Sequence, residues 1–123
     1  MKRPLQILCV ALAAAANFAH ADADAKRGAE LYQARCSACH SIAVNRVGPA
    51  HQGTFGRRAG SAPDYDYSTA VKRSKLIWTA TNLDRWLANP ERLIPGQKMG
   101  YAVAEAQDRA DLIAHLQAHS SVR

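Results

Sequence analysis

The sequence predicts a small all-α fold, and three observations support this prediction. Apolar residues recur at helical spacing near both ends of the chain, and no convincing run of alternating β-branched residues interrupts them. Residues that cap and end helices stand between the two apolar stripes. The length of 123 residues suits a single domain.

Two longer helices are predicted, one near each end of the segment 22–123. The first runs from Asp24 to Arg35 and the second covers the region from Ala106 onward. Their apolar faces consist of Ala25, Gly28, Ala29 and Tyr32 in the first, and of Ala106, Ala110, Leu112, Ile113 and Leu116 in the second.

Shorter elements are expected between these helices. A capping box at residues 81–84 predicts a helix through Leu83, Trp86 and Leu87, which Asn89 and Pro90 end. Pro90 can also start a further turn at residues 91–94. Residues 47–67 hold four of the seven glycines and two prolines, which predicts a long ordered loop. Loops of that length are uncommon unless they serve a function or wrap something.

Residues 1–21 have the layout of a secretory signal peptide, which leaves 22–123 as the domain. A charged start is followed by an apolar run from Leu5 to Ala16 and by small residues at Ala19 and Ala21. The run is shorter than the ~20 residues of a membrane-spanning helix, so a retained anchor is the weaker interpretation. Cys9 lies within this segment and is interpreted as an apolar residue that is removed.

The net charge is moderately basic. It is +6 for the whole chain and +4 once Lys2 and Arg3 leave with the signal peptide. The basic residues are scattered without interleaved aromatic residues, which argues against a nucleic-acid-binding protein. They form either an ordinary solvated surface or a face that steers an acidic protein partner.

The segment Cys36-Ser37-Ala38-Cys39-His40 carries the chemistry of this chain. C-x-x-C-H is the pattern of a covalent haem c attachment site. Two thiols at this spacing can each reach one vinyl group of the porphyrin, and the next side chain then lies over the iron. His40 is therefore the predicted proximal ligand.

Three other interpretations of the two cysteines compete with haem attachment. A thioredoxin-like dithiol requires a βαβ context that this helical pattern does not offer. A structural zinc site requires four ligands, and only two cysteines remain after the signal peptide is removed. A disulfide between Cys36 and Cys39 would close only a short loop.

Met99 is the predicted distal ligand. It is the one methionine besides the initiator, and it follows a Pro95-Gly96 turn that could hold its thioether rigidly. A lone methionine is more often core filler, but the haem motif reverses that preference here. His51 follows the Gly-Pro corner too closely to be the ligand, and His115 and His119 belong to the C-terminal helix.

The chain resembles the class I c-type cytochromes, especially the mitochondrial-like and bacterial periplasmic type. The resemblance covers nearly all of the predicted domain in both order and spacing. It rests on Cys36–His40, Val47-Gly48-Pro49, Gly56-Arg57, Tyr65-Asp66-Tyr67, Trp78, Asn89-Pro90, Pro95–Met99 and Asp111–Leu116. It implies crossed N- and C-terminal helices, with short helices and long loops wrapped around one covalent haem c and its iron.

The resemblance also assigns roles to individual residues. Met99 matches the distal ligand, and the Pro49 carbonyl matches the group that orients the imidazole of His40. The positions that bind or offset the haem propionates are Arg57, Tyr67 and Trp78. Gly28 matches the helix crossing, where Tyr32 and Leu112 pack, and Lys98 matches part of a basic docking face.

Four residues depart from the family pattern. Trp86 replaces a tyrosine on the methionine side, Val71 replaces an asparagine, and Gln97 replaces a threonine beside the ligand. His115 stands where an aromatic ring commonly packs between the terminal helices. The first three put the family's internal water network in doubt, and none of the four is an iron ligand.

These features predict a periplasmic single-haem carrier of one electron that is not an enzyme. The expected partners are an oxidase, a reductase, a cytochrome bc1-type complex or a dehydrogenase, docking near Lys98. The protein is expected to be a monomer without nucleic acid and without stable membrane insertion. The alternatives are peroxidase-like or gas-sensing activity, which would require Met99 to be a labile ligand.

Overall fold

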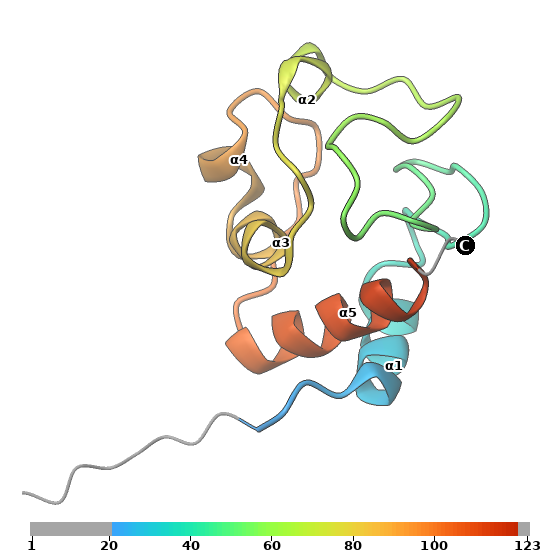
Figure 1. Cartoon of the computed structure of the whole chain (residues 1–123), viewed down its shortest axis with the longest axis vertical. Helices are drawn as coiled ribbons and strands as arrows, with labels where there is room; N and C mark the ends of the chain where they lie inside the picture. Colours follow the sequence, from blue (N-terminus) through green and yellow to red (C-terminus); the bar gives the residue numbers. More distant parts are fainter. Residues whose placement is uncertain (1–20, 121–123) are drawn as a thin grey trace, which may run out of the picture.

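The computed structural model describes residues 21–120, and in this part of the chain all regular elements are helices. The first and last helices, α1 (Ala25–Arg35) and α5 (Ala106–Ala118), cross at one end of the molecule (Figure 1). An isolated bridge joins Arg58 to Ile77, but no strand forms among the described residues. The all-α prediction is confirmed. The predicted signal peptide, residues 1–21, lies outside the described residues except for its last residue.

Helix α1 begins at a well-formed N-cap, Asp24. The Asp24 carboxylate accepts hydrogen bonds from the backbone N–H groups of Lys26 and Arg27, which lack partners within the helix. None of the described helices is both long enough and apolar enough to cross a membrane.

The crossing of α1 and α5 depends on Gly28. A Cβ atom on Gly28 would lie 1.9 Å from the backbone oxygen of Asp111, which is far below any real contact distance. Tyr32 and Leu112 are buried at the same interface, as the sequence predicted. Glycine therefore allows the two helix backbones to touch.

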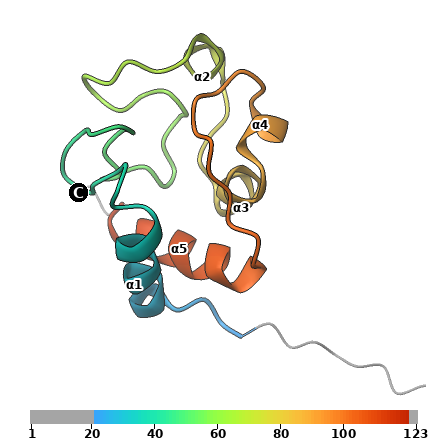
Figure 2. The ribbon, with the colours of Figure 1, turned by 180° about the vertical axis from the view of Figure 1, so that it is seen from behind.

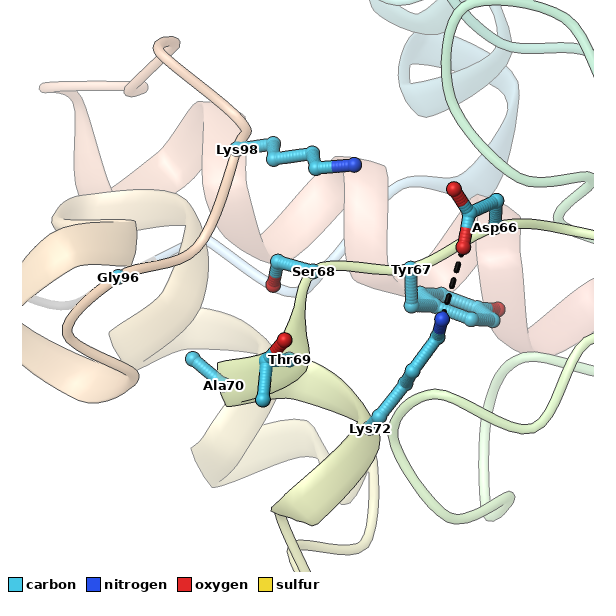
Figure 3. A pocket seen from close by; sticks show the side chains of 8 residues that line it. All are labelled: Asp66, Tyr67, Ser68, Thr69, Ala70, Lys72, Gly96 and Lys98. Carbon is cyan, nitrogen blue, oxygen red and sulfur yellow. Dashed lines mark hydrogen bonds and ion pairs between the residues drawn. The ribbon is translucent and has the colours of Figure 1, made fainter.

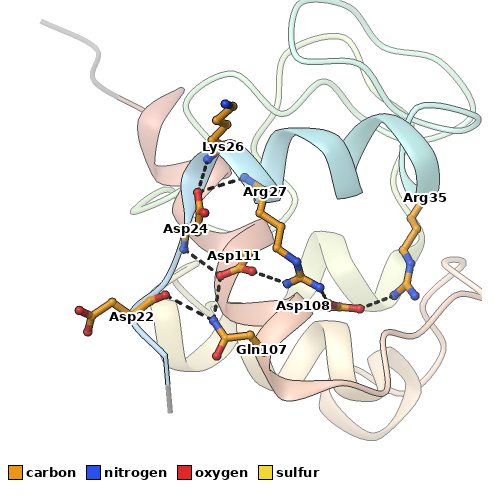
Figure 4. A network of polar contacts seen from close by, with 8 residues as sticks. All are labelled: Asp22, Asp24, Lys26, Arg27, Arg35, Gln107, Asp108 and Asp111. Atoms are coloured by element: carbon orange, nitrogen blue, oxygen red, sulfur yellow. Dashed lines mark hydrogen bonds and ion pairs between the residues drawn. The ribbon is translucent and has the colours of Figure 1, made fainter. Parts of the chain in front are cut away.

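A polar network joins the same two helices (Figure 4). The guanidinium of Arg27 binds both Asp108 and Asp111, and Arg35 pairs with Asp108 at 3.2 Å. The backbone N–H of Asp24 donates to Asp111 Oδ1 at 2.8 Å. Burial alone would raise the pKa of Asp111, but the hydrogen bonds from Asp24 and Arg27 outweigh it and lower that pKa.

Three short helices complete the fold. They are α2 (Thr69–Arg73), α3 (Ala80–Ala88) and α4 (Pro90–Leu93). The predicted capping box was wrong by two residues, because Thr79 caps α3 by accepting a hydrogen bond from Asn82 N at 3.1 Å. The predicted stop at Asn89 and the new turn at Pro90 are confirmed.

A single core lies between these helices. Leu112 of α5 and Val103 are almost completely buried, and Leu83 and Leu87 of α3 pack in the same cluster with Trp78. Residues 36–68 form no helix, as the glycine and proline content predicted, and they make the loops that Figure 2 shows beside the helices.

Replacing Gly28 with alanine should destabilise the fold by about 3 kcal/mol, because the new methyl group meets backbone rather than a movable side chain. Helix propensity alone would make Gly28→Ala stabilising by about 1 kcal/mol. A loss of stability would therefore indicate the close contact between the helices. Urea unfolding measures the effect. Gly100→Ala is the control, because no atom lies within 4 Å of the place its methyl group would take. Equal stability of Gly28→Ala and wild type would contradict the close crossing.

Acid should weaken the α1–α5 network. Since the folded-state pKa of Asp111 is lowered, its stabilisation is complete above the unfolded-state pKa and is lost as the pH falls through the folded-state value, beginning below about pH 5. We expect Asp111→Asn to cost about 1–3 kcal/mol at pH 7, with a smaller difference from wild type at low pH.

Urea unfolding of both proteins across this pH range tests the expectation. The matched control is Asp66→Asn, which removes an exposed ion pair with Lys72 and should have little effect. A stability difference that stays constant with pH would contradict the assignment to the Asp111 carboxylate.

Candidate haem site

The C-x-x-C-H segment begins where α1 ends. Cys36 is the C-cap of the helix, and its N–H donates to Tyr32 O at 2.8 Å. A tight turn follows, in which the N–H groups of Cys39 and His40 both donate to Cys36 O. The helix therefore sets the direction of the turn that carries both thiols and the imidazole.

The His40 ring is oriented by the next loop. Its Nδ1 lies 2.9 Å from the carbonyl oxygen of Pro49. Because a carbonyl only accepts, Nδ1 must carry the proton, and the lone pair is on Nε2. Burial lowers the pKa of His40, with the Pro49 contact opposing it, so the ring is neutral at pH 7 and Nε2 is available as a ligand.

Gly48 packs directly on this ring. A Cβ atom there would lie 2.1 Å from Cε1 of His40, so a side chain at this position is not compatible with the observed ring. The N–H of Gly48 donates to Cys39 O at 2.7 Å and ties the loop to the attachment turn. The sequence Gly48-Pro49 thus supplies both the space and the acceptor that the imidazole needs.

His51 stacks on His40, with ring centroids 4.1 Å apart and an interplanar angle of 20°. His51 therefore lies beside the predicted ligand His40 and not on a separate segment of the chain. Tyr32 hydrogen-bonds to His51 Nδ1 at 2.9 Å, and the His115 ring lies 5.0 Å from the Tyr32 ring. His119 continues the same cluster, so the remaining histidines of the described chain gather on the His40 side.

Met99 lies on a separate segment, after α4. It is half-buried and packs against the core cluster. The Gln97 side chain accepts a hydrogen bond from Met99 N through Oε1 and donates to Glu91 Oε2 at 3.2 Å. Glu91 Oε1 also accepts from Gly96 N at 2.9 Å, and Gly96 has a φ of 89°, which favours glycine.

The hydrogen bonds that Glu91 and Gln97 make around Met99 were not predicted from the sequence, where Gln97 was only a departure from the family pattern and Glu91 had no role. The spacing of Glu91 and Gln97 carries no recognisable signal, because these contacts depend on how the turn after α4 folds back.

Arg57 and Trp78 are brought together by their backbones. Trp78 N donates to Arg57 O at 2.9 Å, and Gly56 N donates to Trp78 O at 2.9 Å. The Arg57 guanidinium donates to Gln52 O and to Thr54 Oγ1, but its buried Nε has no hydrogen-bond partner. A buried donor without an acceptor is costly, so this atom is suited to an anionic group that enters the fold.

Tyr67 lies on the rim of a polar pocket of about 560 Å³, between α2 and the Met99 segment (Figure 3). Its hydroxyl oxygen accepts a hydrogen bond from Ala62 N at 3.0 Å, which leaves the O–H free to donate. Lys98 points into this pocket from the opposite wall.

The cysteines match haem attachment better than the competing interpretations. Both thiols are free, and no group of three or more candidate metal ligands occurs among the described residues. Burial raises the pKa of Cys36 to about 11, with Arg35 opposing the shift and Cys39 adding to it. A reactive dithiol requires a lowered thiol pKa instead.

The residues therefore fit a covalently attached haem. The two free thiols, the Nε2 lone pair of His40 and the unpaired Nε of Arg57 are each explained by one such group.

Comparisons with known proteins agree with this fit. The family described as Cytochrome c matches residues 25–120. Cytochrome c of Euglena viridis is 42% identical over 96 residues, which cover 76% of this chain and 94% of that protein. Cytochrome c of Theileria parva is also 42% identical, over 81% of this chain and 90% of that protein. The solved structure of cytochrome cH from Methylobacterium extorquens has a TM-score of 0.74 at 38% identity, covering 77% of this chain and 98% of that chain.

Replacing Arg57 with alanine should lower the reduction potential of the holoprotein, because losing a buried positive charge favours the more positive ferric state. It should also cost about 1–3 kcal/mol of stability through the lost hydrogen bonds. A redox titration and urea unfolding measure the two effects. Arg58→Ala is the control, since Arg58 is adjacent but exposed, and an equal fall in potential there would contradict a specific role for Arg57.

Proposed function

The chain belongs to the cytochrome c family, whose members carry one covalently bound haem c with its iron, and we propose that it transfers single electrons in the periplasm through a His40- and Met99-ligated haem. The family makes it a haem-based electron-transfer protein. The observation that carries the finer proposal is the contact of His40 Nδ1 with the Pro49 carbonyl, which leaves the lone pair on Nε2 available to an iron ion.

The two ligand-bearing segments have complementary tasks. Pro49 and Gly48 hold the imidazole in one tautomer and one orientation, which increases its basicity as a ligand. Gln97 and Glu91 hold the backbone at Met99. When bound, the haem iron accepts and releases one electron. A thioether ligand opposite histidine raises the reduction potential.

Ligation by both His40 and Met99 would also limit other chemistry. It would leave oxygen or peroxide no free place at the iron, which favours a carrier over an enzyme. The peroxidase-like and gas-sensing alternatives both require release of Met99.

We place partner docking at the end of the molecule that holds α2, α4 and the Met99 segment (Figures 1 and 2). The exposed basic residues of these elements are Lys72, Arg73, Arg92 and Lys98, and the exposed Lys75 follows α2. Lys98 forms no ion pair within the described part of the chain. A redox partner with an acidic surface, such as an oxidase, a reductase, a cytochrome bc1-type complex or a dehydrogenase, fits this face, with the protein acting as a monomer.

Replacing Met99 with alanine should remove sulfur ligation from the ferric protein and lower its reduction potential, because a thioether favours the ferrous state. Carbon monoxide should also bind the reduced variant more rapidly than it binds wild type. Optical spectra during a redox titration measure these changes. Tyr101→Ala is the control, since it truncates an exposed side chain two residues further on, and an unchanged Met99→Ala spectrum would remove Met99 from the site.

A further inference from the structure

Asn45 connects two loops through both ends of its side-chain amide. Its Nδ2 donates to Pro63 O at 2.9 Å, and its Oδ1 accepts from Ala50 N at 2.8 Å. The contact with Ala50 is partly buried, whereas the contact with Pro63 is exposed. The motifs that pointed to a haem did not include this residue.

The contact with Ala50 matters because of the peptide group to which that nitrogen belongs. The Pro49–Ala50 peptide places its carbonyl oxygen against His40 Nδ1 and its N–H against Asn45 Oδ1. The three groups thus form one hydrogen-bonded chain, in which His40 donates to the peptide and the peptide donates to Asn45. Donation by a peptide N–H polarises the group and makes its carbonyl a stronger acceptor.

The same contacts fix the place of this peptide. Pro49 has no N–H of its own, and Asn45 holds Ala50 while Pro63 on the next loop holds Asn45. The acceptor that His40 needs is therefore anchored from outside the attachment turn.

We propose that Asn45 is a positioning residue for the iron ligand His40, acting through the Pro49–Ala50 peptide. This inference rests on the proposed ligation by His40. By strengthening the Pro49 carbonyl as an acceptor, Asn45 increases the electron donation of the imidazole and favours the ferric state. Asn45 thus lowers the reduction potential of the protein.

The test compares wild-type holoprotein with Asn45→Ala, Asn45→Asp and the control Asn82→Ala. Asn82 also donates through its amide to a backbone carbonyl, Ile77 O at 2.8 Å, but it belongs to α3 and has no contact with the His40 loop. The measurements are the reduction potential and the hydrogen-exchange rate of the His40 Nδ1 proton, followed by NMR in the diamagnetic reduced state.

Asn45→Ala should raise the potential and make the His40 Nδ1 proton exchange roughly fivefold faster, as expected for a weakening of about 1 kcal/mol. Asn45→Asp keeps the acceptor for Ala50 N, loses the donor to Pro63 O and adds negative charge, so the potential should fall and exchange should accelerate less than in Asn45→Ala. The charge effect weakens in high salt, whereas an effect through the hydrogen bonds remains, so both variants are titrated at low and high ionic strength.

Several results would overturn the inference. One is a fall in the potential of Asn45→Ala, which indicates that a loosened loop admits water. Another is a change no larger than that of Asn82→Ala. If Asn45→Ala fails to retain its fold, a rise in the potential of Asn45→Asp overturns it. A wild-type spectrum without histidine ligation would instead refute the proposed function itself, and is distinguishable because it appears before any substitution.

Discussion

The contact between the backbones of α1 and α5 is the constraint on which the site depends. Gly28 lies against the carbonyl of Asp111, and the salt bridges of Arg27 hold the same crossing. Because Cys36 follows α1 without a linker, the crossing also determines where the attachment turn starts. A shift of α1 along α5 would move the two thiols and the proximal imidazole together. The stability of the crossing and the geometry of the iron ligand are therefore coupled through one helix.

The parts that sequence reasoning predicted are those with a local signal. The periodicity of the two terminal helices, the stop at Asn89 and the glycine-rich loop can all be recognised within a few neighbouring residues. The cysteine and histidine spacing is equally local. The N-terminus of α3 shows the limit of such signals, since Thr79 and Thr81 are both plausible caps and only the folded chain selects Thr79.

The parts that sequence reasoning missed depend on contacts between distant segments or on the way a turn folds back. The hydrogen bonds that unite Arg57 with Trp78 connect two loops. Gln97 is a departure from the family pattern, and its side chain reaches both Met99 N and Glu91. Trp86, another departure from the family pattern, packs edge-on against Trp78, with the ring centroids 5.2 Å apart. His115 packs beside Tyr32 between the terminal helices. The residue assignments made by resemblance to the family, including the propionate partners, stay predictions.

The segments of the two proposed ligands, His40 and Met99, are held in unequal ways. The turn at Met99 is secured by polar contacts that all arise within residues 91–99. The surroundings of His40 are instead tied to the end of α1 and to two separate loops. Regions held by few and local contacts open at lower free energy than regions held by long-range ones. The Met99 segment is consequently expected to open at a lower free energy than the surroundings of His40, while the crossed helices keep their structure.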